Sequence, residues 1–336
     1  MNSYGALEES GVAVVDFSAY LDGSNKQGVG NAIFSSFKDV GFVCLLNHGV
    51  PLEMIAKIFG ATKALFAQPM EVKELARHPP LGTDNRGYSS PGREKIRQPN
   101  ANGDVETPRP TVPDFREHFE CGSEDSTEID NIWPPADVLP GFKETCLEYF
   151  WLCYGVELNL LRALALGMGL EEDYLCRIHS IPDEGNQLRL LHYPSVPLES
   201  LRNETVERIG AHTDFASITL LLQDEVGGLE IEDPREPGLY RAIPPVPGAL
   251  VVNAGDFLMR WSNDTIRSTM HRVRAPPGSE TPDGMIAERY SIPYVSTNDA
   301  KTVIDCIPGT WDAERPKKYE PISAGEYVQK RQAASY

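Results

Sequence analysis

The sequence of 336 residues predicts a mainly β fold with helical additions, in which a jelly-roll core is braced by N-terminal and central helices. Two observations predict this class. From about residue 187 onward, short strand-like segments alternate with turns of Gly, Pro, Asn and Asp, which is typical of double-sheet antiparallel barrels. Amphipathic helical segments precede them, and helices followed by strands indicate a helical layer against a β core. We therefore expect a single compact unit over residues 1–336.

The first predicted elements alternate between strand and helix. The β-branched run VAVVD indicates a strand, and the apolar positions of NAIFSSFKDV recur at helical spacing until Gly41 interrupts them. FVCLLN is the next predicted strand. An amphipathic helix should then begin at Pro51, which suits a first helical turn, and should end before Pro69.

The rest of the chain divides into a loop, two helices and a strand-rich core. Residues 77–114 are rich in proline, glycine and polar residues and predict a long lid loop, because long loops in compact domains are often binding elements. Helices are expected over roughly 141–169 and over 322–336. We predict an N-terminal region over 11–120 and a core over 185–300. The expected core strands lie in QLRLLHYP, SITLLLQD, GLEIED, YRAIPPVPGALVVNAGD, STMHRVRAP and ERYSIPYV.

Composition narrows the possible partners. The net charge of −18 argues against a nucleic acid or an anionic membrane surface as a partner, so we expect a small-molecule substrate. The six cysteines are scattered without a C-x-x-C pair, which favours free thiols in a reducing compartment. No signal peptide or long apolar span is evident, and we expect a soluble, cytoplasmic protein. These patterns predict no particular oligomeric state.

A metal site is indicated by His212 and Asp214, which stand two residues apart at the head of an apolar run. Residues i and i+2 of a strand share a face, so both side chains can reach one ion. Alone, this spacing is more typical of a turn at the end of a strand. Among the other six histidines, His271 is the best third ligand because it sits in a predicted strand, after the hairpin-like turn WSND. Two histidines and one carboxylate leave coordination positions open, as in non-haem Fe(II) oxygenases.

A carboxylate anchor is indicated by Arg289 and Ser291, which share one face of a later strand. An arginine inside a barrel is costly unless it is paired. A guanidinium beside a hydroxyl suits a carboxylate group. A dicarboxylate could therefore chelate the metal at one end and meet Arg289 and Ser291 at the other.

These motifs together carry a family resemblance. His212-Thr213-Asp214, His271 and Arg289-Tyr290-Ser291, in that order, resemble the Fe(II)/2-oxoglutarate-dependent dioxygenases of the isopenicillin N synthase-like family. GFVCLLNHGV and NAGDFLMRWSNDTIRSTMHRV resemble further segments of that family, and the similarity covers nearly the whole chain.

The resemblance implies a double-stranded β-helix core with Fe(II) held by His212, Asp214 and His271. It implies 2-oxoglutarate and O₂ as co-substrates, with succinate and CO₂ as products. The far carboxylate of 2-oxoglutarate would meet Arg289 and Ser291, assisted by Tyr193.

Two groups of fungal enzymes within that family resemble the chain most. One is the thymine 7-hydroxylases, through NRGYSSPGREK, LRLLHYP and the C-terminal KYEPISAGEYVQKRQAASY. The other is the polyketide oxygenases that hydroxylate a ring methyl or expand the ring to a tropolone. Thymine hydroxylases carry a tyrosine after the metal aspartate and an aromatic residue after the R-x-S-x-x-Y strand. Phe215 and Val295 stand there instead, which favours the polyketide group, because a flat nucleobase gains from stacking and polar edge contacts.

Six residues are the predicted substrate contacts. Arg189 shares a strand face with Tyr193 and could bind a phenolate, ketone or carboxylate oxygen, although an ion pair with Asp214 or Glu120 is the alternative. The lid candidates are Asn85, Arg86 and Tyr88, and the wall candidates are Phe215 and Val295.

Other functions stay open at this point. An oxidase like isopenicillin N synthase would use the arginine–serine pair for its substrate and would need no 2-oxoglutarate. A non-catalytic β-barrel with a metal site would bind a ligand without turnover. A zinc hydrolase would leave Arg289 and Ser291 without a role.

Overall fold

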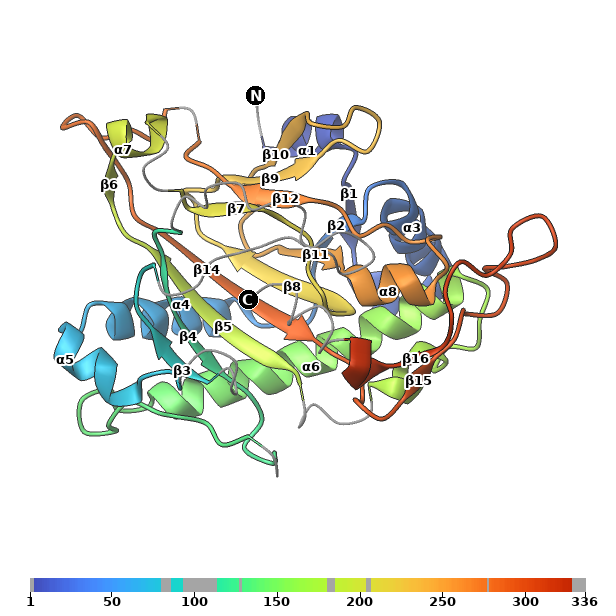
Figure 1. The fold of residues 1–336 in the computed structure, drawn as a ribbon, viewed down its shortest axis with the longest axis horizontal. Helices are drawn as coiled ribbons and strands as arrows, with labels where there is room; N and C mark the ends of the chain where they lie inside the picture. The colour runs from blue at the N-terminus through green and yellow to red at the C-terminus, as the bar shows by residue number, and fades with distance from the viewer. Residues whose placement is uncertain are drawn as a thin grey trace.

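Two β-sheets facing each other form the centre of the structure (Figure 1). The structure is a computed structural model, and it describes residues 3–79, 86–92, 114–126, 129–179, 185–203, 207–276 and 278–327. In the large sheet the strand order is β1-β2-β11-β8-β14-β5-β4-β3, and in the small sheet it is β10-β9-β12-β7. Except for the parallel pair β1–β2, neighbouring strands run antiparallel, as expected of a jelly roll.

The strands of the large sheet are β1 (Ala13–Asp16), β2 (Phe42–Leu46), β11 (Leu250–Ala254), β8 (Ile218–Gln223), β14 (Arg289–Ser296), β5 (Gln187–Tyr193), β4 (Glu117–Cys121) and β3 (Gly87–Ser89). The strands of the small sheet are β10 (Tyr240–Ile243), β9 (Leu229–Glu232), β12 (His271–Val273) and β7 (Ile209–His212). Two short pairs flank them: β6 (Val196–Pro197) with β13 (Met285–Ile286), and β15 (Val303–Ile304) with β16 (Ile322–Ser323).

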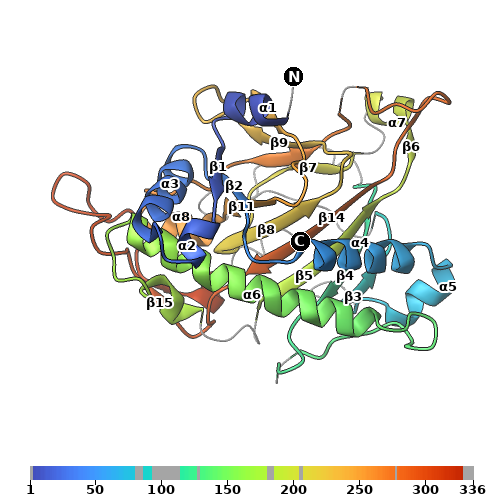
Figure 2. The same ribbon diagram turned by 180° about the vertical axis from the view of Figure 1, so that it is seen from behind.

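Helices cover the outer face of the large sheet. The longest, α6 (Phe142–Gly167), runs across β5, β8 and β14, with α4 (Leu52–Phe66) beside it, as Figure 2 shows. α3 (Lys26–Asp39) packs on α6 at a close crossing, where a Cβ on Gly167 would lie 2.2 Å from the carbonyl oxygen of Gly30. Within the described ranges, the further named helices are α1 (Ser3–Ser10), α2 (Ser18–Leu21), α5 (Met70–Lys73), α7 (Leu198–Arg202) and α8 (Asp256–Trp261), with short 3₁₀ turns at Glu74–Ala76 and Leu175–Ile178.

Strand alternation separates an apolar outer face from a polar inner face. On β5, Leu188 and Leu190 belong to the main core beneath the helices. Arg189 and Tyr193, of opposite parity, face the small sheet, and Tyr193 packs there against Ile209 of β7. The functional side chains therefore gather in the space between the two sheets.

The structure corrects several boundaries predicted from the sequence. The segment YRAIPPVPGALVVNAGD forms two strands in different sheets, β10 and β11, because its prolines cannot continue a ladder. WSND is not a hairpin turn: it ends α8, where Asn263 and Asp264 adopt positive φ. The predicted loop 77–114 contains β3. The predicted helix over 322–336 begins as strand β16, and residues 324–327 are helical.

Two further observations concern chemistry and environment. All six cysteines are free thiols. Within the described ranges, no helix has both the length and the apolar character needed to cross a membrane.

Candidate active site

Three potential metal ligands meet between the sheets. His212 ends β7 and His271 begins β12, and the two histidines are direct partners in this antiparallel pair. Asp214 follows two residues after His212. Its Oδ1 lies 3.7 Å from Nε2 of His212 and 3.6 Å from Nε2 of His271. All three donor atoms lie within 4.8 Å of one another, a spacing that one ion can bridge.

Backbone carbonyls orient both imidazoles toward this point. Nδ1 of His212 donates to the carbonyl of Gly210 at 2.9 Å, and Nδ1 of His271 donates to the carbonyl of Thr269 at 3.2 Å. A proton held on Nδ1 leaves the lone pair of Nε2 for a metal. Burial, followed by the neighbouring His271, lowers the pKa of His212 to about 3, so this ring is neutral at physiological pH, as a ligand must be.

Asp214 is oriented through its other oxygen. Oδ2 accepts hydrogen bonds from Oγ1 of Thr219 at 2.6 Å and from Nδ2 of Asn253 at 2.8 Å, which leaves Oδ1 turned to the histidines. Burial raises the pKa of Asp214, but the two histidines and these hydrogen bonds outweigh it, so the pKa lies below its ordinary value. Sequence reasoning missed both supporting residues. Asn253 had a usable signal, since it is the one amide within the buried apolar run LVVNA.

The turn before α8 holds the Asp214 loop in place. The backbone N–H of Asp256 donates to the carbonyl of Asp214 at 2.7 Å, and Oγ1 of Thr213 donates to Oδ2 of Asp256 at 3.0 Å. Gly255 permits this approach, because a Cβ there would lie 2.1 Å from the carbonyl oxygen of Ala216. The carboxylate is therefore positioned by backbone as well as by side chains.

A second polar cluster lies further along the inner face. Arg289 and Ser291 are each 1% exposed, and Nη1 of Arg289 donates to Oγ of Ser291 at 2.9 Å. Nε of Arg289 donates to the carbonyl of Gly227 at 2.6 Å. Tyr193 is the cross-strand partner of Arg289, and its ring centroid lies 4.9 Å from the guanidinium carbon. The three residues proposed to anchor 2-oxoglutarate are thus neighbours, with the guanidinium fixed on two sides.

The donor set fits Fe(II), and the second cluster fits a dicarboxylate co-substrate. Two imidazoles and one carboxylate approach from one side only, which suits a facial Fe(II) site with open positions. The side chains of His212, Asp214 and His271 remain 17%, 20% and 11% exposed, so this point is reachable from solvent. When bound, Fe(II) activates O₂ with 2-oxoglutarate as the reductant.

The predicted substrate contacts are distributed unevenly. Arg189 is on the inner face, and its Nε lies 2.5 Å from Oε1 of the fully buried Glu120, one of the two ion pairs considered for it. Val295 pairs with Thr219 across β14 and β8, which places it on the inner face near Asp214. Phe215 is half-buried directly after Asp214.

The lid candidates are only partly supported. Tyr88 is the register partner of the core residue Phe119, so it points to the outer, helix-covered face, and its hydroxyl binds Glu117 there. We therefore correct the prediction that Tyr88 contacts substrate. Arg86 is buried, with Nη2 packed 2.3 Å from where a Cβ of Gly122 would lie. Asn85 lies outside the described residues.

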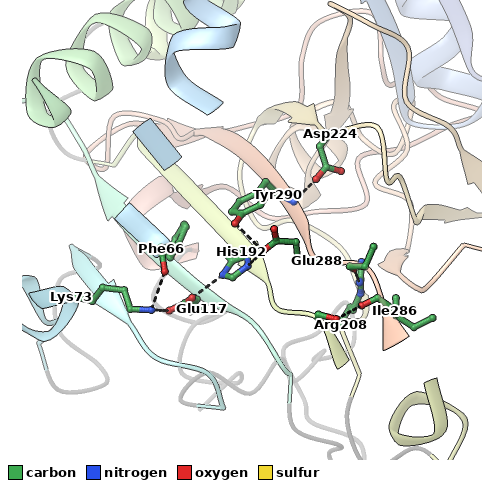
Figure 3. A network of polar contacts seen from close by, with 11 residues as sticks. Phe66, Lys73, Glu117, His192, Arg208, Asp224, Ile286, Glu288 and Tyr290 are labelled. Atoms are coloured by element: carbon green, nitrogen blue, oxygen red, sulfur yellow. Dashed lines mark hydrogen bonds and ion pairs between the residues drawn. The ribbon is translucent and has the colours of Figure 1, made fainter. Parts of the chain in front are cut away.

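An ion network that runs from the buried Lys73 to the exposed Glu288 supports the anchor strand from the outer face (Figure 3). Nζ of Lys73 lies 2.7 Å from Oε2 of Glu117, and Oε1 of Glu117 lies 2.8 Å from Nδ1 of His192. Nε2 of His192 reaches Glu288 at 3.1 Å, and the hydroxyl of Tyr290 donates to the same carboxylate at 3.1 Å. This network joins α5, β4 and β5 to the start of β14, where Arg289 lies.

Comparison with known proteins places this geometry in a family. Residues 12–136 match the non-haem dioxygenase in morphine synthesis N-terminal family, and residues 185–298 match the 2OG-Fe(II) oxygenase superfamily. Proline hydroxylase buaE of Petromyces alliaceus is 36% identical over 90% of this chain and 92% of the relative. The 2-oxoglutarate-dependent dioxygenase gloF of Glarea lozoyensis is 36% identical over 88% and 90%.

Solved structures agree with these sequence relatives. The chain resembles the full-length thymine 7-hydroxylase of Neurospora crassa in complex with alpha-KG, with a TM-score of 0.84 and 39% identity over 96% of each chain. The same hydroxylase in complex with alpha-KG and thymine gives a TM-score of 0.84 and 38% identity over 97% of each chain. The chain therefore belongs to the 2OG-Fe(II) oxygenase superfamily and is an Fe(II)/2-oxoglutarate-dependent dioxygenase.

Proposed function

We propose that this enzyme oxidises a ring methyl of a small ring-bearing molecule, a fungal polyketide, by hydroxylation or by ring expansion to a tropolone. Its cofactor would be Fe(II) held by His212, Asp214 and His271. The observation that carries the proposal is the distribution of apolar and charged groups around these ligands. Val295 and Phe215 adjoin Asp214, whereas the guanidinium of Arg189 lies further along the inner face.

The strand register supports separate positions for the co-substrate and the substrate along the inner face. Tyr193 and Arg289 lie opposite each other at one end of the β5–β14 pair, and Val295 lies opposite Gln187 at the other. Arg189 is four residues from Tyr193 on the same face, about 13 Å along the strand. 2-Oxoglutarate would occupy the stretch between its anchor and the metal. The substrate would then lie toward Val295 and Arg189.

Each inner-face residue has a defined task in this scheme. Arg289 and Ser291, with Tyr193, bind the far carboxylate of 2-oxoglutarate and fix its orientation. Val295 and Phe215 exclude water and admit an apolar methyl group next to the metal. Arg189 holds an oxygen on the ring edge, so that the methyl group is presented in one orientation.

Glu120 controls how Arg189 can act. The carboxylate of Glu120 is fully buried, and His78 and His118 lie 3.7 and 3.8 Å from its Oε2. A carboxylate held in this way fixes the guanidinium in place while part of the Arg189 side chain, 23% exposed, faces the site. This arrangement favours a substrate that offers Arg189 a neutral or anionic oxygen.

A pyrimidine substrate is the second candidate. It is favoured by the resemblance to the Neurospora crassa hydroxylase, which was solved with alpha-KG and thymine. Thymine is also a ring that carries a methyl group and oxygen atoms on its edge. Phe215 and Val295 lack the hydroxyl and the additional ring that stand at these positions in thymine hydroxylases, and this difference supports the polyketide assignment.

A succinate-release screen tests the proposal. The Fe(II) enzyme is supplied with 2-oxoglutarate, O₂ and one ring compound from a panel of methylated phenols, methylated dienones, thymine and proline. We expect stoichiometric succinate and an oxidised methyl carbon with a phenol or dienone. Turnover of thymine alone would select the second candidate. Oxidation only of proline, or oxidation without 2-oxoglutarate, would contradict the proposed function.

A further inference from the structure

A second buried arginine lies at the anchor end of the barrel. Arg208 immediately precedes β7 and is 2% exposed. Its Nη2 donates to the carbonyl of Ala287, two residues before Arg289, and Figure 3 shows this side chain directed to the backbone beside Ile286. Within the described part of the chain, Nε and Nη1 of Arg208 have no hydrogen-bond partner.

Arg208 and Arg289 share one aromatic ring. The guanidinium carbon of Arg208 lies 5.8 Å from the ring centroid of Tyr193, and that of Arg289 lies 4.9 Å from it. Burial, and then the positive charge of Arg289, lower the pKa of Arg208 to about 10. It still carries its charge at neutral pH, so two like charges are buried close together.

One carboxylate acts on both of these cations. Asp224 interacts electrostatically with Arg208 and with Arg289. Its oxygens are used elsewhere, because Oδ2 accepts from the N–H of Tyr290 at 2.6 Å and Oδ1 from the N–H of Val226 at 3.1 Å. Taken together, these two guanidinium groups and the one carboxylate that acts on both carry one net positive charge.

We propose that Arg208 is a second cation of the 2-oxoglutarate anchor, whose charge is balanced when the far carboxylate of the co-substrate binds beside Arg289. The inference rests on the proposed binding of the far carboxylate of 2-oxoglutarate at Arg289 and Ser291. An unbalanced buried charge opposes folding, and a neutral side chain at this site would stabilise the unloaded protein better. A bound carboxylate brings the missing negative charge. Arg208 is thus a positioning residue, acting through the local field and through Tyr193.

The test compares Arg208→Gln with the wild type in co-substrate binding rather than in turnover. Each protein is loaded with Fe(II) without oxygen and titrated with 2-oxoglutarate, and Kd is read from the visible band of the chelate. We expect the glutamine variant to bind roughly tenfold more weakly or worse. Arg208→Lys, which keeps a positive charge, should lose much less affinity for 2-oxoglutarate. Arg241→Gln is the matched control, because Arg241 on β10 already has Asp233 as its partner at 3.1 Å and should leave Kd unchanged.

A second readout separates charge from structure. 2-Oxopentanoate has the same metal-chelating end but no far carboxylate, so the wild type should prefer 2-oxoglutarate strongly and the glutamine variant should prefer it less. Without ligand, the glutamine variant should melt within a few degrees of the wild type or above it.

Three results would decide against Arg208. A glutamine variant with the wild-type Kd, or one that keeps the full preference over 2-oxopentanoate, shows a purely structural residue. A glutamine variant that cannot fold also contradicts the proposal, since removal of an unbalanced charge should not destabilise the unloaded protein. If the wild type itself gives no 2-oxoglutarate band, the proposed function fails before this inference does.

Discussion

The buried carboxylate of Glu157 should make the stability of this enzyme depend on pH. Glu157 lies on α6 and is fully buried beneath β14. Oε1 accepts from Ser296 at 2.6 Å, and Oε2 accepts from Tyr294 and Asn186 at 2.9 Å each. Burial outweighs these hydrogen bonds and raises the pKa of Glu157 from 4.5 to about 7. The perturbation that tests this is Glu157→Gln, which keeps the shape and removes the titration.

The size and sign of the effect follow from this pKa. A tenfold change in proton affinity is worth about 1.4 kcal/mol, so a rise from 4.5 to about 7 corresponds to about 3 kcal/mol. Between these pH values the folded protein keeps the proton of Glu157 and the unfolded chain does not. The free energy of unfolding therefore falls by about 3 kcal/mol as pH rises from 4.5 to about 7. Outside this window, the titration of Glu157 does not make the free energy of unfolding depend on pH.

The assay is urea denaturation of wild type and Glu157→Gln at several pH values between about 4 and 8, on either side of this window. Because other groups titrate as well, the quantity of interest is the difference between the two proteins. From the lower to the upper end of this window, the free energy of unfolding of the glutamine variant should rise by about 3 kcal/mol relative to that of the wild type. Glu148→Gln is the control, since Glu148 lies on the same helix with a 55% exposed side chain, and it should track the wild type. If the Glu157→Gln difference does not change with pH, the buried carboxylate is not protonated as argued.

Three further predictions test the site and the helix crossing. Thr219→Val removes one of the two hydrogen bonds that orient Asp214 and should weaken Fe(II) binding roughly tenfold, measured by metal titration; unchanged affinity would show that the hydrogen bond does not orient the carboxylate. Arg289→Ala should raise Kd for 2-oxoglutarate by roughly thirtyfold or more in the anaerobic titration, and a wild-type Kd would reject the anchor. Gly167→Ala should lower the free energy of unfolding, measured with urea, by about 1–3 kcal/mol, because its methyl group meets the backbone of Gly30. Wild-type stability would mean that α3 and α6 can move apart at this crossing without a cost in free energy.

The fold class was predictable because local patterns encode it. The alternation in QLRLLHY and SITLLLQ separates inner from outer residues before any pairing is known. Pairing itself is not local. β11 lies between β2 and β8 in the large sheet, whereas β12, joined to it through α8, lies in the small sheet between β9 and β7. No spacing within the sequence specifies that the chain crosses from the large sheet to the small sheet between β11 and β12.

The metal ligands could be proposed from sequence because their chemistry is unusual for strand positions. His212 and Asp214 were expected to share a face by parity, and His271 stood out as a polar residue in a predicted strand, where it is the first residue of β12. The second buried arginine was beyond that reasoning. Arg208 looks like an ordinary charged residue before a strand, and only the structure shows it buried beside Arg289. Tyr88 failed for a related reason, since the face of the short strand β3 depends on its pairing with β4.

The most direct test of the central claim is the anaerobic titration of the Fe(II) protein with 2-oxoglutarate. Fe(II) is expected on His212, Asp214 and His271, with positions open for the co-substrate. We predict that the wild type gives the visible chelate band and that the band saturates at one 2-oxoglutarate per protein chain. Folded His271→Ala should give no such band under the same conditions. A band of equal strength in His271→Ala, or its absence from wild type that carries one iron per chain, would contradict the assignment of this site.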